Sequence, residues 1–118
     1  MLRSVGLLGV SLVLMAASAP PPPAVQKAFT GTIVSTYPDG RIAKLWMNPS
    51  GDFTSEGRRH DRHKGHWSVK GDKVCFRRGI GSYCTAIPDG AGKSFTTKAV
   101  TGETIQVRLA PGRAGETG

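Results

Sequence analysis

The sequence predicts an all-β domain, an antiparallel meander of about eight short strands that closes into a small barrel or a pinched sandwich with one disulfide. Two observations predict this fold. Between residues 28 and 109 apolar residues alternate with a period of two, and turn residues recur about every 8–12 residues. The chain also has 16 glycines and 8 prolines in 118 residues, which favours short segments joined by many turns over a helical bundle.

Two turns of similar chemistry separate the first three expected strands. They are Tyr37-Pro38-Asp39-Gly40 and Asn48-Pro49-Ser50-Gly51. In each, proline presets the turn and glycine accepts a positive φ. We therefore expect strands over residues 29–36, 41–47 and 52–57.

A two-residue hairpin turn at Gly71-Asp72 follows, between expected strands at 66–70 and 73–77. Further strands are expected at 82–87, 93–100 and 103–109. With this turn, Trp67 faces Phe76. The register therefore places the large apolar side chains of both strands on one face.

The two cysteines, Cys75 and Cys84, are predicted to form that disulfide across the next hairpin, on the face opposite the core. In this register Tyr83 lies beside Phe76. The expected core residues of the central strands are Trp67, Val69, Val74, Phe76 and Tyr83.

The ends of the chain have a different composition. Residues 1–18 have a basic start, an apolar run and small residues at the end, which is typical of a secretory signal peptide, with cleavage expected after Ser18 or Ala19. We expect a proline-rich linker over 19–27, the folded domain over 28–109 and a disordered tail over 110–118. The mature chain would be a periplasmic or secreted monomer without a transmembrane helix.

The loop from Arg58 to His66 is the most unusual segment, because it contains all three histidines together with four Lys or Arg and one Asp. The simplest interpretation is a solvated hairpin loop. A Zn²⁺ or Cu²⁺ site made by His60, His63 and His66 is an alternative, and a pH-sensitive contact is another.

The same loop also suggests a polyanion-binding patch, since the chain has a net charge of +8 and export disfavours nucleic acid as a partner. The candidate partners that remain are lipopolysaccharide, anionic lipid and an acidic protein. Acidification should strengthen such binding by charging the histidines. The expected contact residues are Arg58, Arg59, Arg62, Lys64, Arg77 and Arg78.

Two further interpretations concern aromatic and acidic residues. An open barrel could use its aromatic side chains as a stacking platform, but core packing is the simpler role for Trp46, Phe53, Trp67 and Phe76. Most aspartates lie in turns. The one candidate for a catalytic acid–base pair is Asp61 with His60 or His63. We expect no enzyme activity and no cofactor.

The segment Gly65-His66-Trp67 with Gly71-Asp72, Cys75 and Cys84 resembles the G-x-W…G-D…C…C core of small exported proteobacterial β-proteins, mostly uncharacterised. The outline is also similar to the bacterial metalloprotease inhibitor barrel and, more distantly, to lipocalins. The inhibitor resemblance implies that residues 19–27 take the place of a trunk inserted into a protease cleft, and no resemblance implies catalysis.

Together these observations predict an exported, non-catalytic binding module of the cell envelope, either protease-inhibitor-like or polyanion-binding. Its partner would be an envelope protein or an anionic surface. The alternatives are an envelope structural protein without a specific ligand and a weak Zn²⁺- or Cu²⁺-binding protein.

Overall fold

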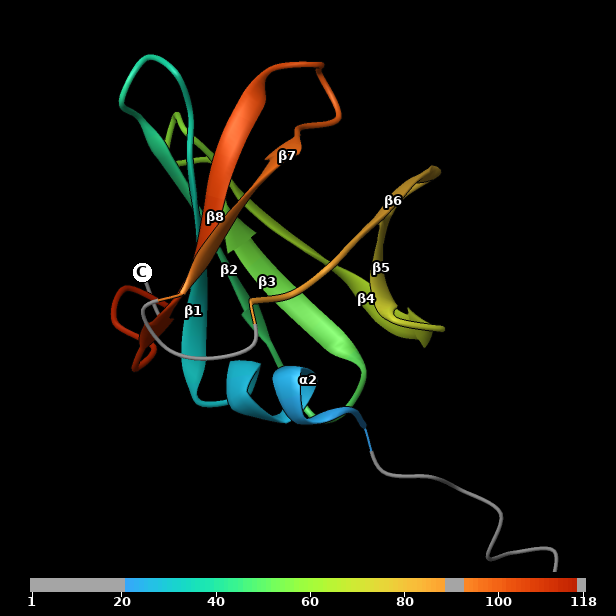
Figure 1. Ribbon diagram of the computed structural model, residues 1–118. Coiled ribbons are helices and arrows are strands. Elements are labelled where there is room, and N and C mark those ends of the chain that lie inside the picture. Colours follow the sequence, from blue (N-terminus) through green and yellow to red (C-terminus); the bar gives the residue numbers. More distant parts are fainter. Residues whose placement is uncertain (1–20, 89–92, 117–118) are drawn as a thin grey trace, which may run out of the picture.

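The computed structural model describes residues 21–88 and 93–116, and its strands form one antiparallel sheet. The sheet has the order β6-β5-β4-β3-β2-β1-β8-β7 and curves into a nearly closed barrel, with β6 and β7 at its edges (Figure 1). The elements are α2 (Pro23–Ala28), β1 (Gly31–Thr36), β2 (Ile42–Met47), β3 (Asp52–Glu56), β4 (Arg62–Lys70), β5 (Lys73–Arg78), β6 (Gly81–Thr85), β7 (Ser94–Lys98) and β8 (Thr104–Pro111). The predicted all-β fold is confirmed.

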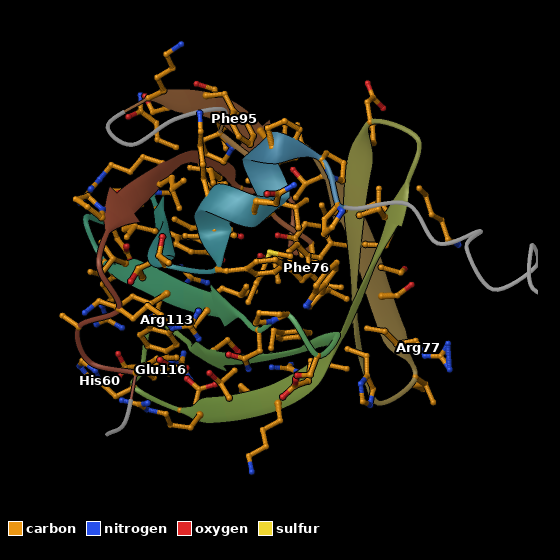
Figure 2. The ribbon with its side chains drawn as sticks, turned by 90° about the horizontal axis from the view of Figure 1, so that it is seen from below. His60, Phe76, Arg77, Phe95, Arg113 and Glu116 are labelled. Carbon is orange, nitrogen blue, oxygen red and sulfur yellow. A yellow bond between two sulfur atoms is a disulfide. The ribbon has the colours of Figure 1, made fainter. Side chains whose placement is uncertain are left out.

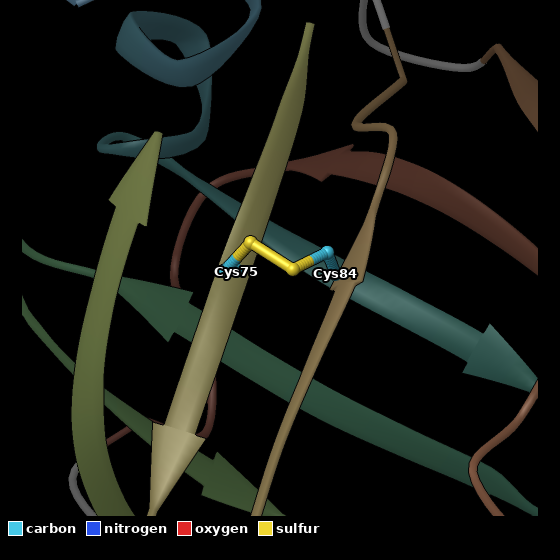
Figure 3. The surroundings of a disulfide bond; sticks show 2 residues. All are labelled: Cys75 and Cys84. Atoms are coloured by element: carbon cyan, nitrogen blue, oxygen red, sulfur yellow. A yellow bond between two sulfur atoms is a disulfide. The ribbon is translucent and has the colours of Figure 1, made fainter. Parts of the chain in front are cut away.

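The predicted register of the central hairpins is also confirmed. Trp67 faces Phe76 between β4 and β5, and Cys75 faces Cys84 between β5 and β6. The two cysteines form the disulfide, with Cα atoms 3.9 Å apart, and it links the neighbouring strands β5 and β6 (Figure 3). Since Phe76 is inside the barrel, its neighbour Cys75 lies on the outer face of the strand.

The core fills the barrel between β8 and the β3–β5 region. Phe53 and Phe76 meet edge to face with ring centroids 5.4 Å apart, and Tyr83 extends this cluster. The buried core residues are Val25, Ala28, Ile33, Met47, Phe53, Val74, Phe76, Ile105, Val107 and Leu109. Trp67 and Tyr83 are partly buried and pack against this cluster.

Val69 is the exception among the expected core residues, because it is 37% exposed. Its strand β4 continues beyond the last residue pair with β3, which joins Asp52 to His66. From there on β4 has a neighbour only on the β5 side. The side-chain alternation along β4 correctly predicts that Val69 points to the inner face. No strand of the described residues covers this side chain on the β3 side, so it stays exposed.

The predicted proline-rich linker is wrong for residues 23–27, which belong to helix α2. Pro23 stands in the first turn of the helix, where a missing N–H breaks no hydrogen bond. Val25 and Ala28 are buried and close one end of the barrel (Figures 1 and 2). The predicted signal peptide, residues 1–18, lies outside the described residues.

The predicted disordered tail is wrong for residues 110–116. Strand β8 continues through Pro111, where it pairs with Gly31 of β1. The following residues fold against the barrel, and the Arg113 side chain forms hydrogen bonds there. Residues 117 and 118 lie outside the described part.

The expected loop Arg58–His66 is mostly strand. The turn itself is short, since the backbone N–H of Gly57 donates to the carbonyl of Asp61, and His60 has a φ of 66° within it. Strand β4 already begins at Arg62. Across residues 21–88 and 93–116, no helix is long and apolar enough to cross a membrane.

Candidate functional site: a basic outer face and an open barrel mouth

The three histidines occupy three different surroundings. His60 lies in the turn, where its Nδ1 is 3.5 Å from the carboxylate of Glu56. His63 and His66 are both on β4 but three positions apart, so one points into the barrel and the other outward. The part of the chain that the structure describes contains no group of three or more metal-ligating side chains. The fold therefore separates the residues of the predicted metal site.

Two of the six cations expected to contact a polyanion are engaged in internal contacts. Arg58 pairs with Glu103 at 3.2 Å and Asp39 at 3.7 Å, and its guanidinium lies 3.9 Å above the ring centre of Tyr37. The two carboxylates lie in turns distant in sequence from Arg58, so these ion pairs could not be predicted from the sequence.

Arg62 is the second engaged cation. It lies 3.6 Å from Glu56 and donates hydrogen bonds to the carbonyl oxygens of Gly115 and Glu116. Its guanidinium also lies over the ring of Trp46. Arg62 therefore holds the folded-back C-terminal segment, and its charge is largely balanced.

The other four cations, Arg59, Lys64, Arg77 and Arg78, are exposed, and none forms an ion pair within the described residues. Alternation along β5 sends the two adjacent arginines to different faces. Arg78 shares the inner face with Phe76, whereas Arg77 points away from the barrel (Figure 2).

A larger group of basic side chains lies on the outer face of β4 and β5. We call it the basic face, and it consists of Lys64, His66, Lys70, Lys73 and Arg77, all exposed. The register sets His66 opposite Arg77 and Lys70 opposite Lys73. Like charges directly opposite each other in a sheet are destabilising. The list of expected contact residues omitted Lys70 and Lys73, although the predicted register already pairs them on this face.

The carboxylates nearest to the basic face do little to balance it. Asp52 faces His66 from β3. The hydroxyl of Ser50 lowers the pKa of Asp52, with smaller contributions from Asn48 and His66, so this carboxylate is already hydrogen-bonded. Asp72 lies in the exposed turn between the two facing lysines.

An isolated apolar side chain lies beside the basic face. Ile80 stands in the turn between β5 and β6 and is fully exposed. Arg77 and Arg78 end the strand that leads into this turn. The tip of the hairpin thus combines two cations with one aliphatic side chain.

Several hairpin turns lie at the end of the barrel opposite to α2, which we call the barrel mouth (Figure 1). This barrel mouth holds a cavity of about 230 Å³. His63 points into it and contacts Asp61 at 2.5 Å, and this hydrogen bond lowers the pKa of Asp61. Burial raises the pKa of Tyr83 on the cavity wall, with a smaller contribution from Tyr37.

The aromatic residues do not form an exposed stacking platform. Phe53 and Phe76 are in the core, as core packing predicts. Trp46 is fully buried on the outer face of β2, where its Nε1 donates to the Thr32 hydroxyl at 3.0 Å. Trp67 is half-buried and donates to a backbone carbonyl, that of Asn48, at 2.8 Å.

Comparisons with protein-family models, curated proteins and solved structures found no match for this chain.

Proposed function

We propose that this protein is an exported, non-catalytic binding module of the cell envelope, and that its basic face attaches to phosphate-bearing lipid surfaces. The observation that supports this most directly is the cross-strand arrangement of Lys70 with Lys73 and of His66 with Arg77. The two lysines repel each other in the free protein. An anionic surface would remove that repulsion.

The electrostatic contribution can be estimated. A Lys or Arg near an anionic membrane surface contributes about 1 kcal/mol, so Lys64, Lys70, Lys73 and Arg77 together would contribute about 4 kcal/mol. Insertion of the fully exposed Ile80 side chain into the interface would add up to about 1.5–3 kcal/mol. The sum of about 5.5–7 kcal/mol corresponds to weak binding with a dissociation constant of about 10⁻⁴ to 10⁻⁵ M.

The competing interpretations have less support from the geometry. An inhibitor-like trunk needs a free N-terminal segment, whereas residues 23–28 form α2 and pack into the core. A metal site needs its histidines together, and the fold separates them. Export is supported by the composition of residues 1–18, and the Cys75–Cys84 disulfide is compatible with it.

The test is co-sedimentation of the protein with phospholipid vesicles. The wild type should bind vesicles that contain phosphatidylglycerol or lipopolysaccharide, should not bind pure phosphatidylcholine, and should release with rising salt. Removing two charges by Lys73→Gln and Arg77→Gln should weaken binding by about tenfold or more.

A matched control removes the same charge from the other side of the barrel. Lys98 and Arg108 lie on the outer face of β7 and β8, so Lys98→Gln with Arg108→Gln should change binding by less than about threefold. Equal losses in both double variants would indicate that net charge alone attracts the protein, and the basic face would then have no special role. Binding to a DNA duplex as tight as to vesicles would contradict the choice of lipid.

A further inference from the structure

The barrel mouth is a second place where the chain could hold a ligand, separate from the basic face. Its wall includes apolar side chains from three strands, Ile33 of β1, Leu45 of β2 and Ile105 of β8. Tyr37 and Tyr83 line it as well. The cavity volume of about 230 Å³ equals on the order of eight water volumes of about 30 Å³. This space suits a small organic molecule of about ten non-hydrogen atoms.

Most charged groups that line the mouth are balanced by a neighbour. Asp61 is hydrogen-bonded to His63. Glu56 lies 3.6 Å from Arg62, and Arg58 lies 3.2 Å from Glu103. Each of these charges thus has a partner of opposite sign or a hydrogen bond.

Two charged lining residues, Lys44 and Arg78, have no ion pair among the described residues. Lys44 shares the outer face of β2 with Trp46, whereas Arg78 faces inward. It lies on the inner face of β5, and the described residues provide no carboxylate within ion-pair distance of it. Tyr83 lines the same cavity, and burial raises the pKa of its phenol, so the hydroxyl remains a donor at neutral pH. These two hydrogen-bond donors beside an apolar cavity suit a ligand with one carboxylate group.

We propose that the barrel mouth binds a small amphipathic carboxylic acid. Its carboxylate would accept hydrogen bonds from the guanidinium of Arg78, and its hydrocarbon part would lie on Leu45 and Ile105. Binding sites of this kind are commonly concave and apolar with a few placed polar groups. This proposal does not depend on the basic face, since Arg77 and Arg78 point to opposite faces of β5.

Octanoate is a suitable probe, because it has ten non-hydrogen atoms and a single negative charge. Titration of the isotope-labelled protein by NMR should shift the amide signals of residues that line the mouth. Arg78→Gln should weaken octanoate binding by about tenfold, and 1-octanol should bind the wild type more weakly than octanoate by a similar factor.

Two further variants complete the design. Arg77→Gln is the matched control, and it should leave octanoate binding within about twofold. Ala43 lines the cavity, so Ala43→Phe should fill the space and abolish binding, and a thermal melt checks that this variant folds.

The proposal is overturned if octanoate fails to bind at millimolar concentration, if the shifts map to the outer face, or if Arg77→Gln and Arg78→Gln weaken binding equally. None of these outcomes bears on vesicle attachment. Loss of vesicle attachment in the Lys73→Gln, Arg77→Gln variant in turn leaves the octanoate result unchanged.

Discussion

Replacing Arg113 with Gln should release the C-terminal segment from the barrel. The guanidinium uses all five of its N–H donors. They reach the carbonyl oxygens of Phe29 at 2.8 Å and Met47 at 2.6 Å, Asn48 Oδ1 at 2.7 Å, and the two carboxylate oxygens of Glu116 at 2.7 and 2.5 Å. This single side chain therefore ties the tail to α2, β2 and the turn that follows β2.

The expected loss of stability follows from the three bonds to the barrel. A hydrogen bond with a charged partner contributes about 1.5–3 kcal/mol, and values for a side chain that is 20% exposed belong at the low end. Glutamine can replace part of one bond. Arg113→Gln should therefore lower the free energy of unfolding by about 2–4 kcal/mol, measured by urea unfolding with an unchanged slope.

Two variants keep this test specific. Arg108→Gln removes the same charge from an exposed position on β8 and should change stability by less than about 0.5 kcal/mol. Glu116→Gln leaves the three bonds to the barrel intact and should cost less than about 1 kcal/mol. If Arg113→Gln unfolds at the same urea concentration as Arg108→Gln, the tail is not held as described and the reasoning is refuted.

The remaining predictions use the same urea assay. Gly65→Ala should cost about 1–3 kcal/mol, since its Cβ would overlap the backbone carbonyl oxygen of Arg77 on β5, whereas the Cβ of Gly81→Ala meets only an ordinary van der Waals contact and should be near neutral. Replacing Cys75 and Cys84 by Ser should cost about 2–3 kcal/mol, and reductant should bring the wild type to the same value; no effect of reductant would mean that the bond is absent. The hydrogen bond from the guanidinium lowers the folded-state pKa of Glu116, so its contribution is present above the unfolded pKa of about 4.3 and disappears as pH falls through the lower folded value. The stability difference between wild type and Glu116→Gln should therefore be seen at pH 6 and vanish near pH 2, and a constant difference would contradict the assignment.

The central hairpins were predictable because local chemistry determines them. Gly71-Asp72 specifies a two-residue turn, and Gly71 has a φ of 63° in the structure. Once the turn is placed, the pairing of Trp67 with Phe76 follows, since a slip by one residue would expose every large side chain. The cysteines then fix the next hairpin in the same way.

The two ends of the domain could not be predicted, because distant contacts stabilise them. Helix α2 has six residues, too few for a helical period to stand out, and it is held by burial of Val25 and Ala28. Arg113 finds its carbonyl partners 84 and 66 positions away in the sequence. Neither a run of prolines nor a glycine-rich tail contains that information.

The fold distributes the cations of the predicted polyanion patch over several surroundings, for a reason that applies to any charged run on a strand. The cations between Arg58 and Lys64 are adjacent in the sequence, but the turn and the alternation of β4 direct them to separate surroundings, and two of them meet carboxylates. Charges that are distant in sequence are brought together instead by register, as Lys70 is with Lys73. The same rule divides Arg77 from Arg78, so one dipeptide supplies a cation to the basic face and another to the barrel mouth. Counting positive charges along the chain therefore overestimates the charge of each surface. Counting them separately on the two faces of β4 and β5 identifies both candidate sites.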